Sequence, residues 1–258
     1  MFLCLDVGNT HILGGIFKED KIILRFRHAT QLIGTSDQFG IFLITFLQTH
    51  HILPHEITTI SLCSVVPSCD YTLKHALSRY FPSPLFILQA GVKTGLNIKY
   101  KNPNEVGTDR IANAIGAIHA FPNKNIIIID MGTATTFCAI NKQKDYLGGT
   151  ILAGMRLCME SLKANTAKLA EVDIIEAPSV MGRTTKESIQ AGLYYSQLGA
   201  LREIIRELKD TVFKQEPCVV IGTGGFSQLF KDKKVFDLIM PDLVLQGLFI
   251  AGTQNTLI

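Results

Sequence analysis

Two acidic residues occupy equivalent places in two similar stretches of the chain, with spacings that suit phosphate chemistry. Residues 2–10 (FLCLDVGNT) and 125–135 (NIIIIDMGTAT) are each an apolar run that ends in an Asp-x-Gly-(Asn/Thr) turn. Glycine lets a backbone turn tightly, and successive N–H groups in such a turn, with threonine hydroxyls, can hold phosphate oxygens. One motif alone is more often a simple turn. Two copies, carrying Asp6 and Asp130, indicate two turns and two carboxylates around one phosphate chain.

A cation is required if both carboxylates face one ligand, because like charges repel. Phosphoryl transfer supplies that cation as magnesium bound to the nucleotide. A third glycine-rich turn, residues 222–225, could lie against the flat adenosine, and an ordinary turn is an equally good interpretation. The chain contains no Gly-x-x-x-x-Gly-Lys-(Ser/Thr) loop and no Gly-x-Gly-x-x-Gly turn after a strand. We therefore predict a phosphoryl-transfer or phosphate-binding protein of the two-domain, ribonuclease-H-like kind.

Asp109 lies in a Gly-Thr-Asp-Arg sequence, residues 107–110, and has two interpretations. It could cap the helix that the following apolar spacing predicts, which is the commoner role of Asp at such a place. It could also be a general base that takes a proton from a substrate hydroxyl, with Arg110 binding a substrate carboxylate through both of its terminal nitrogens. The residues alone leave both interpretations open. Tyr100 and Thr185 likewise fit a strand end and a helix start.

The repeated stretches also predict the fold that positions these residues. After each Asp the chain continues as alternating strands joined by a polar turn, over residues 1–28 and 125–152. A repeat at this distance indicates two similar domains. We expect an α/β protein with mixed sheets flanked by helices, in which domains 1–115 and 116–258 face each other across a cleft. Helical spacing is found within residues 36–53, 71–80 and 111–118, and a capping box at Thr184 and Glu187 begins a long helix.

Composition narrows the range of partners and compartments. Among 258 residues, 25 are Lys or Arg and 22 are Asp or Glu, and this net charge of +3 does not favour nucleic-acid binding. The six cysteines form no Cys-x-x-Cys pair, so we interpret them as reduced core thiols. We find no basic leader with a cleavage site and no uncharged apolar stretch of about 18 residues. We therefore expect a cytoplasmic protein with no membrane or nucleic-acid partner.

Several segments together resemble the type III pantothenate kinases, which belong to the superfamily of acetate and sugar kinases, heat-shock chaperones and actin. The matching segments are residues 6–10 (DVGNT), 64–68 (SVVPS), Tyr100 with Asn102 and Pro103, 105–110 (EVGTDR), 130–136 (DMGTATT), and Gly148 with Gly149. The resemblance continues through Thr185, Gly192 and residues 245–248 (LQGL), nearly end to end. The Gly-x-Asp-Arg element together with the Asp-x-Gly-Thr-Ala-Thr-Thr strand is highly specific.

The resemblance implies a homodimer that phosphorylates the 4′-hydroxyl of pantothenate with ATP, the first committed step towards coenzyme A. It implies that Asp109 accepts the hydroxyl proton and that Asp130 holds potassium or ammonium, while Mg²⁺ arrives with the nucleotide. The residues implied to hold ATP are Asp6, Val7, Gly8, Asn9, Thr10, His11, Ile12, Leu13 and Thr133. The residues implied to contact pantothenate are Tyr100, Gly107, Thr108, Asp109, Arg110 and Thr185.

The chain departs from the family pattern at three positions, none of which is a matched site residue. These are Ala153, where proline is usual, Thr184, where asparagine is common, and Ala191, where serine is common. Three alternatives stay open. One is a kinase of the same fold that acts on another small hydroxy compound. Another is a catalytically idle relative that serves as a regulatory partner, against which the intact Asp6, Asp109 and Asp130 argue. The third is a structural nucleotide-binding scaffold, which a measurable turnover number would exclude.

Overall fold

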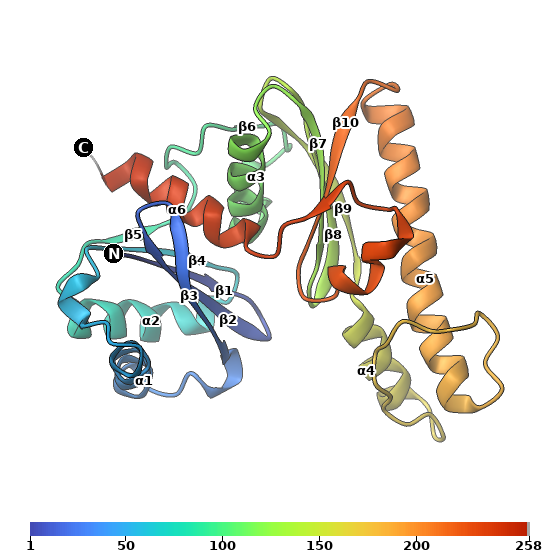
Figure 1. The fold of residues 1–258 in the computed structure, drawn as a ribbon, viewed down its shortest axis with the longest axis horizontal. Coiled ribbons are helices and arrows are strands. Elements are labelled where there is room, and N and C mark those ends of the chain that lie inside the picture. The colour runs from blue at the N-terminus through green and yellow to red at the C-terminus, as the bar shows by residue number, and fades with distance from the viewer. Residues whose placement is uncertain (257–258) are drawn as a thin grey trace. The chain divides into compact units, whose positions relative to one another are not determined.

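The computed structural model describes residues 1–256 of the chain. They form two compact units, each built around one mixed β-sheet (Figure 1). The first unit contains residues 1–96, 100–120 and 242–256, and the second contains residues 97–99 and 121–241. None of the helices in the described range combines the length and the apolar character that crossing a bilayer requires.

The first sheet has five strands in the order β3-β2-β1-β4-β5. Their bounds are β1 Phe2–Val7, β2 His11–Lys18, β3 Lys21–Ala29, β4 Thr59–Ser64 and β5 Leu85–Ile87. β1 pairs antiparallel with β2 and parallel with β4. Because β1 and β4 run in the same direction, their C-terminal ends meet at one edge of the sheet, where Val7 lies opposite Ser64.

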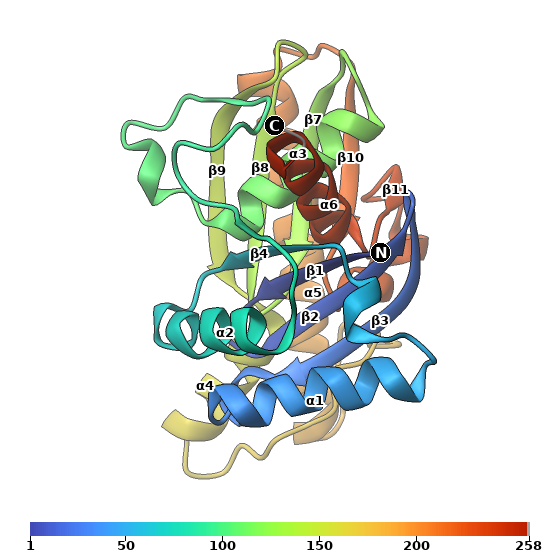
Figure 2. The same ribbon diagram turned by 90° about the vertical axis from the view of Figure 1, so that its left-hand side faces the viewer.

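Two pairs of helices cover the two faces of this sheet (Figure 2). On one face, Leu3, Leu5 and Val7 of β1 pack with apolar side chains of α1 (Ser36–Thr49) and α2 (Pro67–Tyr80). The opposite face is covered by α6 (Leu243–Thr256), which packs on β1 and β4 and against α3 (Thr108–Ala120). Short 3₁₀ turns lie at Thr30–Leu32, Pro54–Glu56 and Pro103–Glu105. α2 begins at Pro67, earlier than the expected residue 71, because proline suits the first turn of a helix.

The close packing of α3 on α6 explains why the chain divides differently from the expected domains 1–115 and 116–258. A Cβ atom added to Gly247 would overlap the Ala112 carbonyl oxygen, and one added to Gly116 would lie 2.7 Å from the Leu243 carbonyl oxygen. These glycines let the two helix backbones approach each other. Residues 116–120 and the described residues of α6 therefore belong to the first unit. Residues 257 and 258 of the expected second domain lie outside the described residues.

The second sheet repeats the topology of the first. Its strands follow the order β11-β10-β7-β8-β9-β6, with bounds β6 Asn97–Ile98, β7 Asn125–Met131, β8 Ala134–Ile140, β9 Asp145–Ala153, β10 Cys218–Thr223 and β11 Leu238–Ile239. β7 pairs antiparallel with β8 and parallel with β10, as β1 pairs with β2 and β4. Apart from the added edge strand β6, the order matches that of the first sheet. The internal repeat predicted from Asp6 and Asp130 is thus confirmed as a repeated sheet.

Helices α4 (Met155–Asn165) and α5 (Thr185–Glu207) belong to the second unit. Leu193, Leu198 and Leu201 of α5 join the core that includes Ile127 and Ile129 of β7. The predicted cap is present, since the Thr184 hydroxyl accepts the Glu187 N–H at 3.2 Å. The Glu187 carboxylate accepts the N–H of Arg183 at 2.7 Å, one residue before the capping position.

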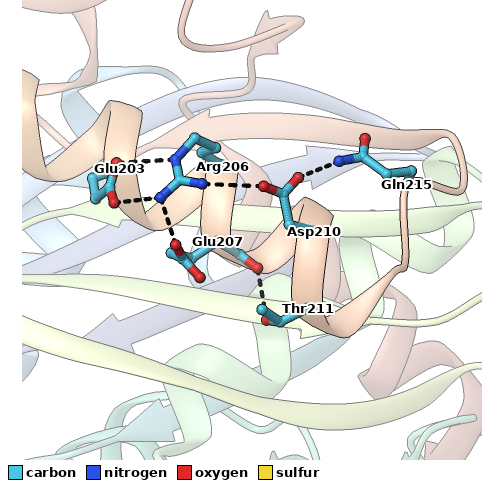
Figure 3. Close-up of polar contacts among 6 residues, drawn as sticks. All are labelled: Glu203, Arg206, Glu207, Asp210, Thr211 and Gln215. Atoms are coloured by element: carbon cyan, nitrogen blue, oxygen red, sulfur yellow. Dashed lines mark hydrogen bonds and ion pairs between the residues drawn. The ribbon is translucent and has the colours of Figure 1, made fainter.

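The C-terminal end of α5 continues into a π-helical turn, Leu208–Val212, and a 3₁₀ helix at Ser227–Lys233 follows strand β10. Figure 3 shows Arg206 bridging this junction. Its guanidinium donates to Glu203 at 2.6 Å, to Glu207 at 2.5 Å and to Asp210 at 3.2 Å. These side chains are exposed and each pair contributes little alone. One cation bound by three carboxylates nevertheless ties the last α-helical turn to the π turn.

Candidate functional site

The first unit gathers two carboxylates around a buried thiol at the C-terminal edge of its sheet. Asp6 of β1 lies in register with Cys63 of β4, and the Cys63 thiol donates a hydrogen bond to Asp6 Oδ1 with a separation of 3.2 Å. Burial raises the pKa of Cys63 well above its ordinary value, and the negative charges of Asp6 and Asp109 raise it further. Both carboxylates therefore act on the same buried sulfur, although they are far apart in the sequence.

The turn after β1 is closed by its own hydrogen bonds. The Gly8 N–H donates to the His11 carbonyl at 3.1 Å, and Thr30 donates to the Gly8 carbonyl from its hydroxyl at 2.7 Å and to the Thr10 carbonyl from its N–H at 3.0 Å. The Gly8 N–H is thus used within the turn whose N–H groups the sequence predicts to hold phosphate. Other groups of the turn would have to hold a phosphate.

The predicted ATP residues of this turn differ in exposure. Asn9 and His11 are exposed, while Asp6, Gly8, Thr10 and Leu13 are partly buried. Val7 and Ile12 are fully buried in the core. Their side chains are part of the packing between sheet and helices, so any contact of these two residues with a nucleotide would be made by their backbone atoms.

Asp109 lies inside the first turn of α3 and not at the capping position. The Gly107 carbonyl accepts the Ile111 N–H at 3.1 Å, and the Thr108 hydroxyl donates to the Ser64 carbonyl at 3.0 Å. The second of these bonds fixes the start of α3 to the end of β4. Because the helix already begins at Thr108, Asp109 is not its capping residue.

The surroundings of the Asp109 carboxylate suit a proton acceptor. Burial raises the pKa of Asp109, and the N–H and the positive guanidinium of Arg110 partly oppose that rise. The N–H bond joins Arg110 to Asp109 Oδ1 with a separation of 2.7 Å. A side chain at Gly107 would lie 2.5 Å from the same oxygen, so glycine leaves room for the carboxylate. A carboxyl group with a raised pKa in the first turn of a helix is a candidate general base.

Arg110 is a buried cation that stands beside Tyr100. Only 5% of the Arg110 surface is exposed. Its Nη1 lies 3.5 Å from the Tyr100 hydroxyl, and its Cζ lies 5.9 Å from the centre of the tyrosine ring. A guanidinium at this distance from an aromatic face is attracted to it. Tyr100 therefore helps to orient the charged group that adjoins Asp109.

The second unit brings Asp130 to the third glycine-rich turn. Asp130 lies opposite Thr223 of β10 in the parallel ladder. Gly224, with a φ of +82°, packs so closely that a Cβ atom there would overlap Asp130 Oδ1. The Gly132 N–H donates to the Ala134 carbonyl at 3.0 Å, and the Gly154 N–H donates to the Thr133 carbonyl at 3.0 Å. The partly exposed Asp130 carboxylate is a hard oxygen ligand, which fits an alkali or alkaline-earth cation.

The remaining predicted residue, Thr185, is the exposed first residue of α5. The sequence does not predict a polar network of the second unit that contains the buried Thr135 and Gln197 side chains. The Thr135 hydroxyl donates to Gln197 at 3.1 Å, and the Gln197 amide donates to the Ala153 carbonyl at 2.9 Å. This network ties β8 and β9 to α5. The predicted residues thus form two groups, one with Asp6, Tyr100 and residues 107–110, the other with Asp130 and Thr133.

Comparison with known sequences identifies the relatives of this chain. The model of the family described as type III pantothenate kinase matches residues 2–207. A curated type III pantothenate kinase from Legionella pneumophila (strain Corby) is 55% identical over 256 residues, which cover 99% of this chain and 100% of the relative. The similarity therefore extends over the whole length of both proteins.

Comparison with solved structures identifies the fold. A Sinorhizobium meliloti protein assigned as a 2-dehydro-3-deoxygalactonokinase matches with a TM-score of 0.60 at 12% identity, over 100% of this chain and 98% of that one. The activator of the 2-hydroxyisocaproyl-CoA dehydratase from Clostridium difficile, solved with bound ADPNP, matches with a TM-score of 0.51 at 13% identity, over 98% and 93%. At these identities the matches concern the fold alone. They confirm the predicted class of two mixed sheets flanked by helices.

The raised pKa of Asp109 predicts that the substitution Asp109→Asn stabilises the fold at neutral pH. A carboxyl group with a raised pKa in the folded state favours folding when protonated and loses that contribution as pH rises through its folded pKa. The melting temperature of Asp109→Asn should exceed that of the unaltered protein at pH 7.5, and the difference should shrink as pH falls towards 4. Thermal unfolding followed by circular dichroism at several pH values measures both.

Asp145→Asn is the matched control, for which we expect the melting temperature to shift in the opposite direction. The Asn141 side chain, followed by those of Asn97 and Lys99, lowers the pKa of Asp145, so its ionised form favours folding and this variant should melt lower at pH 7.5. A melting temperature of Asp109→Asn that is equal to or below that of the unaltered protein at pH 7.5 would contradict the raised pKa of Asp109.

Proposed function

We propose specific roles for the residues of this chain, which belongs to the type III pantothenate kinase family. The enzyme transfers a phosphoryl group from ATP to the 4′-hydroxyl of pantothenate, the first committed step towards coenzyme A, and it uses Mg²⁺ with ATP. The observation that carries this function is the full-length similarity to curated type III pantothenate kinases. The roles of individual residues rest on the chemistry and surroundings of their side chains.

Asp109 is the general base of the proposal. Its Oδ1 accepts the Arg110 N–H, so Oδ2 is the oxygen that receives the proton. As the substrate oxygen attacks the γ-phosphorus of ATP, its proton passes to Oδ2. The bond from that phosphorus to the β–γ bridging oxygen breaks, and ADP leaves. The raised pKa of Asp109 supports this role because it makes the carboxylate more basic.

Pantothenate is a hydroxy acid, and the proposed contacts suit both of its ends. Gly107, Thr108 and Asp109 receive the alcohol at the start of α3, while Arg110 and Tyr100 supply a cation and a hydroxyl for polar groups of the substrate. Thr185, exposed at the start of α5, completes the set with another hydroxyl. Arg110 supports the proposal most directly, since a buried guanidinium is an effective partner for a carboxylate.

In this proposal the two Asp-x-Gly turns bind the nucleotide. In the proposal, residues 6–13 and Thr133 hold ATP, Asp6 faces the magnesium-bound phosphates, and Asp130 holds a monovalent cation, potassium or ammonium. When bound, the cations neutralise charge on the phosphates. The equivalent positions of Asp6 and Asp130 in two sheets of the same topology support this division of roles.

Replacing the base should abolish most turnover without loss of the fold. We expect Asp109→Asn to lower kcat by about 10²- to 10⁴-fold, the usual contribution of general base catalysis, with little change in the KM for ATP. Coupled measurement of ADP release with pantothenate as acceptor gives both constants. Asp20→Asn, in the exposed turn between β2 and β3, is the control and should behave like the unaltered enzyme. A normal kcat for Asp109→Asn would exclude Asp109 as the base.

The assignment of Asp130 predicts dependence on a monovalent cation. At constant ionic strength and saturating Mg²⁺, activity should be high in potassium or ammonium chloride and low in sodium chloride. Asp130→Asn should remove this difference because the neutral amide attracts a cation less strongly. Initial rates across the three salts test the assignment, and full activity in sodium chloride alone would refute it.

A homodimer and a cytoplasmic location complete the proposal. Three apolar side chains of the second unit support the dimer, because Ile151, Val180 and Met181 are 60%, 71% and 75% exposed and exposed apolar groups favour association. Buried thiols such as those of Cys4, Cys63 and Cys69 suit a reducing compartment.

Introducing a charged side chain among these exposed apolar residues of the second unit should dissociate the proposed dimer. We expect the unaltered enzyme to sediment as a dimer and Met181→Lys to sediment as a monomer, because burying a lysine in an apolar interface is costly. Leu32→Lys is the control, since Leu32 of the first unit is also exposed, at 73%, and its replacement should leave the dimer intact. Sedimentation velocity measures all three, and a monomeric unaltered enzyme would overturn the dimer.

A further inference from the structure

The buried thiol of Cys63 has no role in the reaction described above, although it lies beside the two acids of the first unit. We propose that Cys63 is a positioning residue, which holds the Asp6 carboxylate in the orientation that binds magnesium-bound nucleotide. This inference rests on the proposed role of Asp6. It adds a residue that acts through Asp6 without touching either substrate.

The contact is built into the sheet. Asp6 and Cys63 are register partners in the parallel ladder of β1 and β4. Their neighbours Leu5 and Leu62 join the core with α1 and α2. Because successive side chains along a strand point to opposite faces of the sheet, Asp6 and Cys63 lie on the other face. There the thiol donates to Asp6 Oδ1 with a separation of 3.2 Å. Fixing Oδ1 also fixes the rotation of the carboxylate, and therefore the direction in which its second oxygen faces.

The thiol is suited to this position because it stays neutral. Burial and the two nearby carboxylates keep the pKa of Cys63 well above its ordinary value, so the group remains a hydrogen-bond donor. A thiolate would instead add a third negative charge. Cys63 is 0% exposed, so water could not readily replace the lost donor if the thiol were removed.

The second sheet carries a comparable residue at the equivalent place. Asp130 of β7 is in register with Thr223 of β10, as Asp6 is with Cys63. Thr223 is 2% exposed, and its hydroxyl is also a small neutral donor. Both acidic positions of the repeat thus have a buried donor as their parallel-strand neighbour. This recurrence supports a role for the donor beyond filling space.

The test compares substitutions that separate hydrogen bonding from packing. Cys63→Val removes the donor and keeps a side chain of similar size. It should raise the KM for magnesium-bound ATP about five- to tenfold, the effect of losing one hydrogen bond to a charged group through a weak donor, and leave the KM for pantothenate nearly unchanged. Cys63→Ser keeps a donor and should restore the KM for ATP to within about twofold. Melting temperatures of both variants monitor the fold.

A double-mutant cycle tests whether the effect passes through Asp6. Asp6→Ala removes the carboxylate that Cys63 would hold, so adding Cys63→Val to it should cause no further loss of ATP binding. ATP dissociation constants, measured by titration calorimetry with Mg²⁺, complete the cycle without requiring turnover. If Cys63→Val weakens ATP binding by the same factor in the unaltered protein and in Asp6→Ala, the effect is one of packing and the inference is overturned.

The outcomes distinguish this inference from the proposed function. If Asp6→Ala binds ATP weakly while Cys63→Val binds it normally, the role of Asp6 stands and that of Cys63 is overturned. If Cys63→Ser is as impaired as Cys63→Val, the donor is not the cause and the inference fails. If Asp6→Ala binds ATP normally, the proposed nucleotide site fails and the inference fails with it.

Discussion

The parallel pairing of β1 with β4 is the interaction on which the arrangement of the first unit depends. It places Asp6 beside Cys63, and it ends both strands at the same edge of the sheet. The carbonyl of Ser64, the last residue of β4, then anchors Thr108 and so fixes the first turn of α3, where Asp109 lies. A shift of one residue in this ladder would exchange the two faces of the strand and remove Asp6 from the edge group. One strand pairing thus positions acidic groups from two distant parts of the sequence.

Repetition of the sheet gives the chain two similar edges that carry different chemistry. The first edge has a thiol beside its acid and a helix start that supplies a second carboxylate. The second has a threonine beside its acid and a glycine turn, residues 222–225, packed against it. The backbone plan is therefore shared, while the side chains at the strand ends differ. The same topology can therefore carry different site chemistry at its strand ends.

The sequence predicted those features of the fold that depend on local patterns. The repeated strand and Asp-x-Gly turn revealed both antiparallel meanders, and periodic apolar residues predicted α1, α3 and α5. It did not predict that α6 completes the first unit, because that packing depends on Gly116 and Gly247 fitting together across a large sequence separation. Nor did it identify Cys63, which was interpreted only as a core thiol. Its proposed role depends on which residues of β1 and β4 lie opposite each other, and a single sequence does not show this pairing directly.

The site residues illustrate the same limit. The sequence could not decide whether Asp109 caps a helix, and the structure decides it through the Gly107 carbonyl and the Thr108 hydroxyl. It assigned Val7 and Ile12 to a ligand through a motif, whereas both side chains belong to the core. It predicted that N–H groups of the turn after β1 face a phosphate, and in the structure the Gly8 N–H donates within that turn. Motifs thus selected the candidate residues, and the hydrogen bonds of the structure define which of their atoms have partners within the chain.

The membership of α6 in the first unit has a consequence for biosynthesis. Ribosomes make residues 2–120 well before residues 243–256, so a nascent first unit lacks the helix that covers β1 and β4 on one face. During that interval Phe2 and Phe17, which later pack against Phe249, have no such partner. The second unit, whose segments are almost contiguous, can close first. The earliest part of the chain is therefore the last to reach its final form.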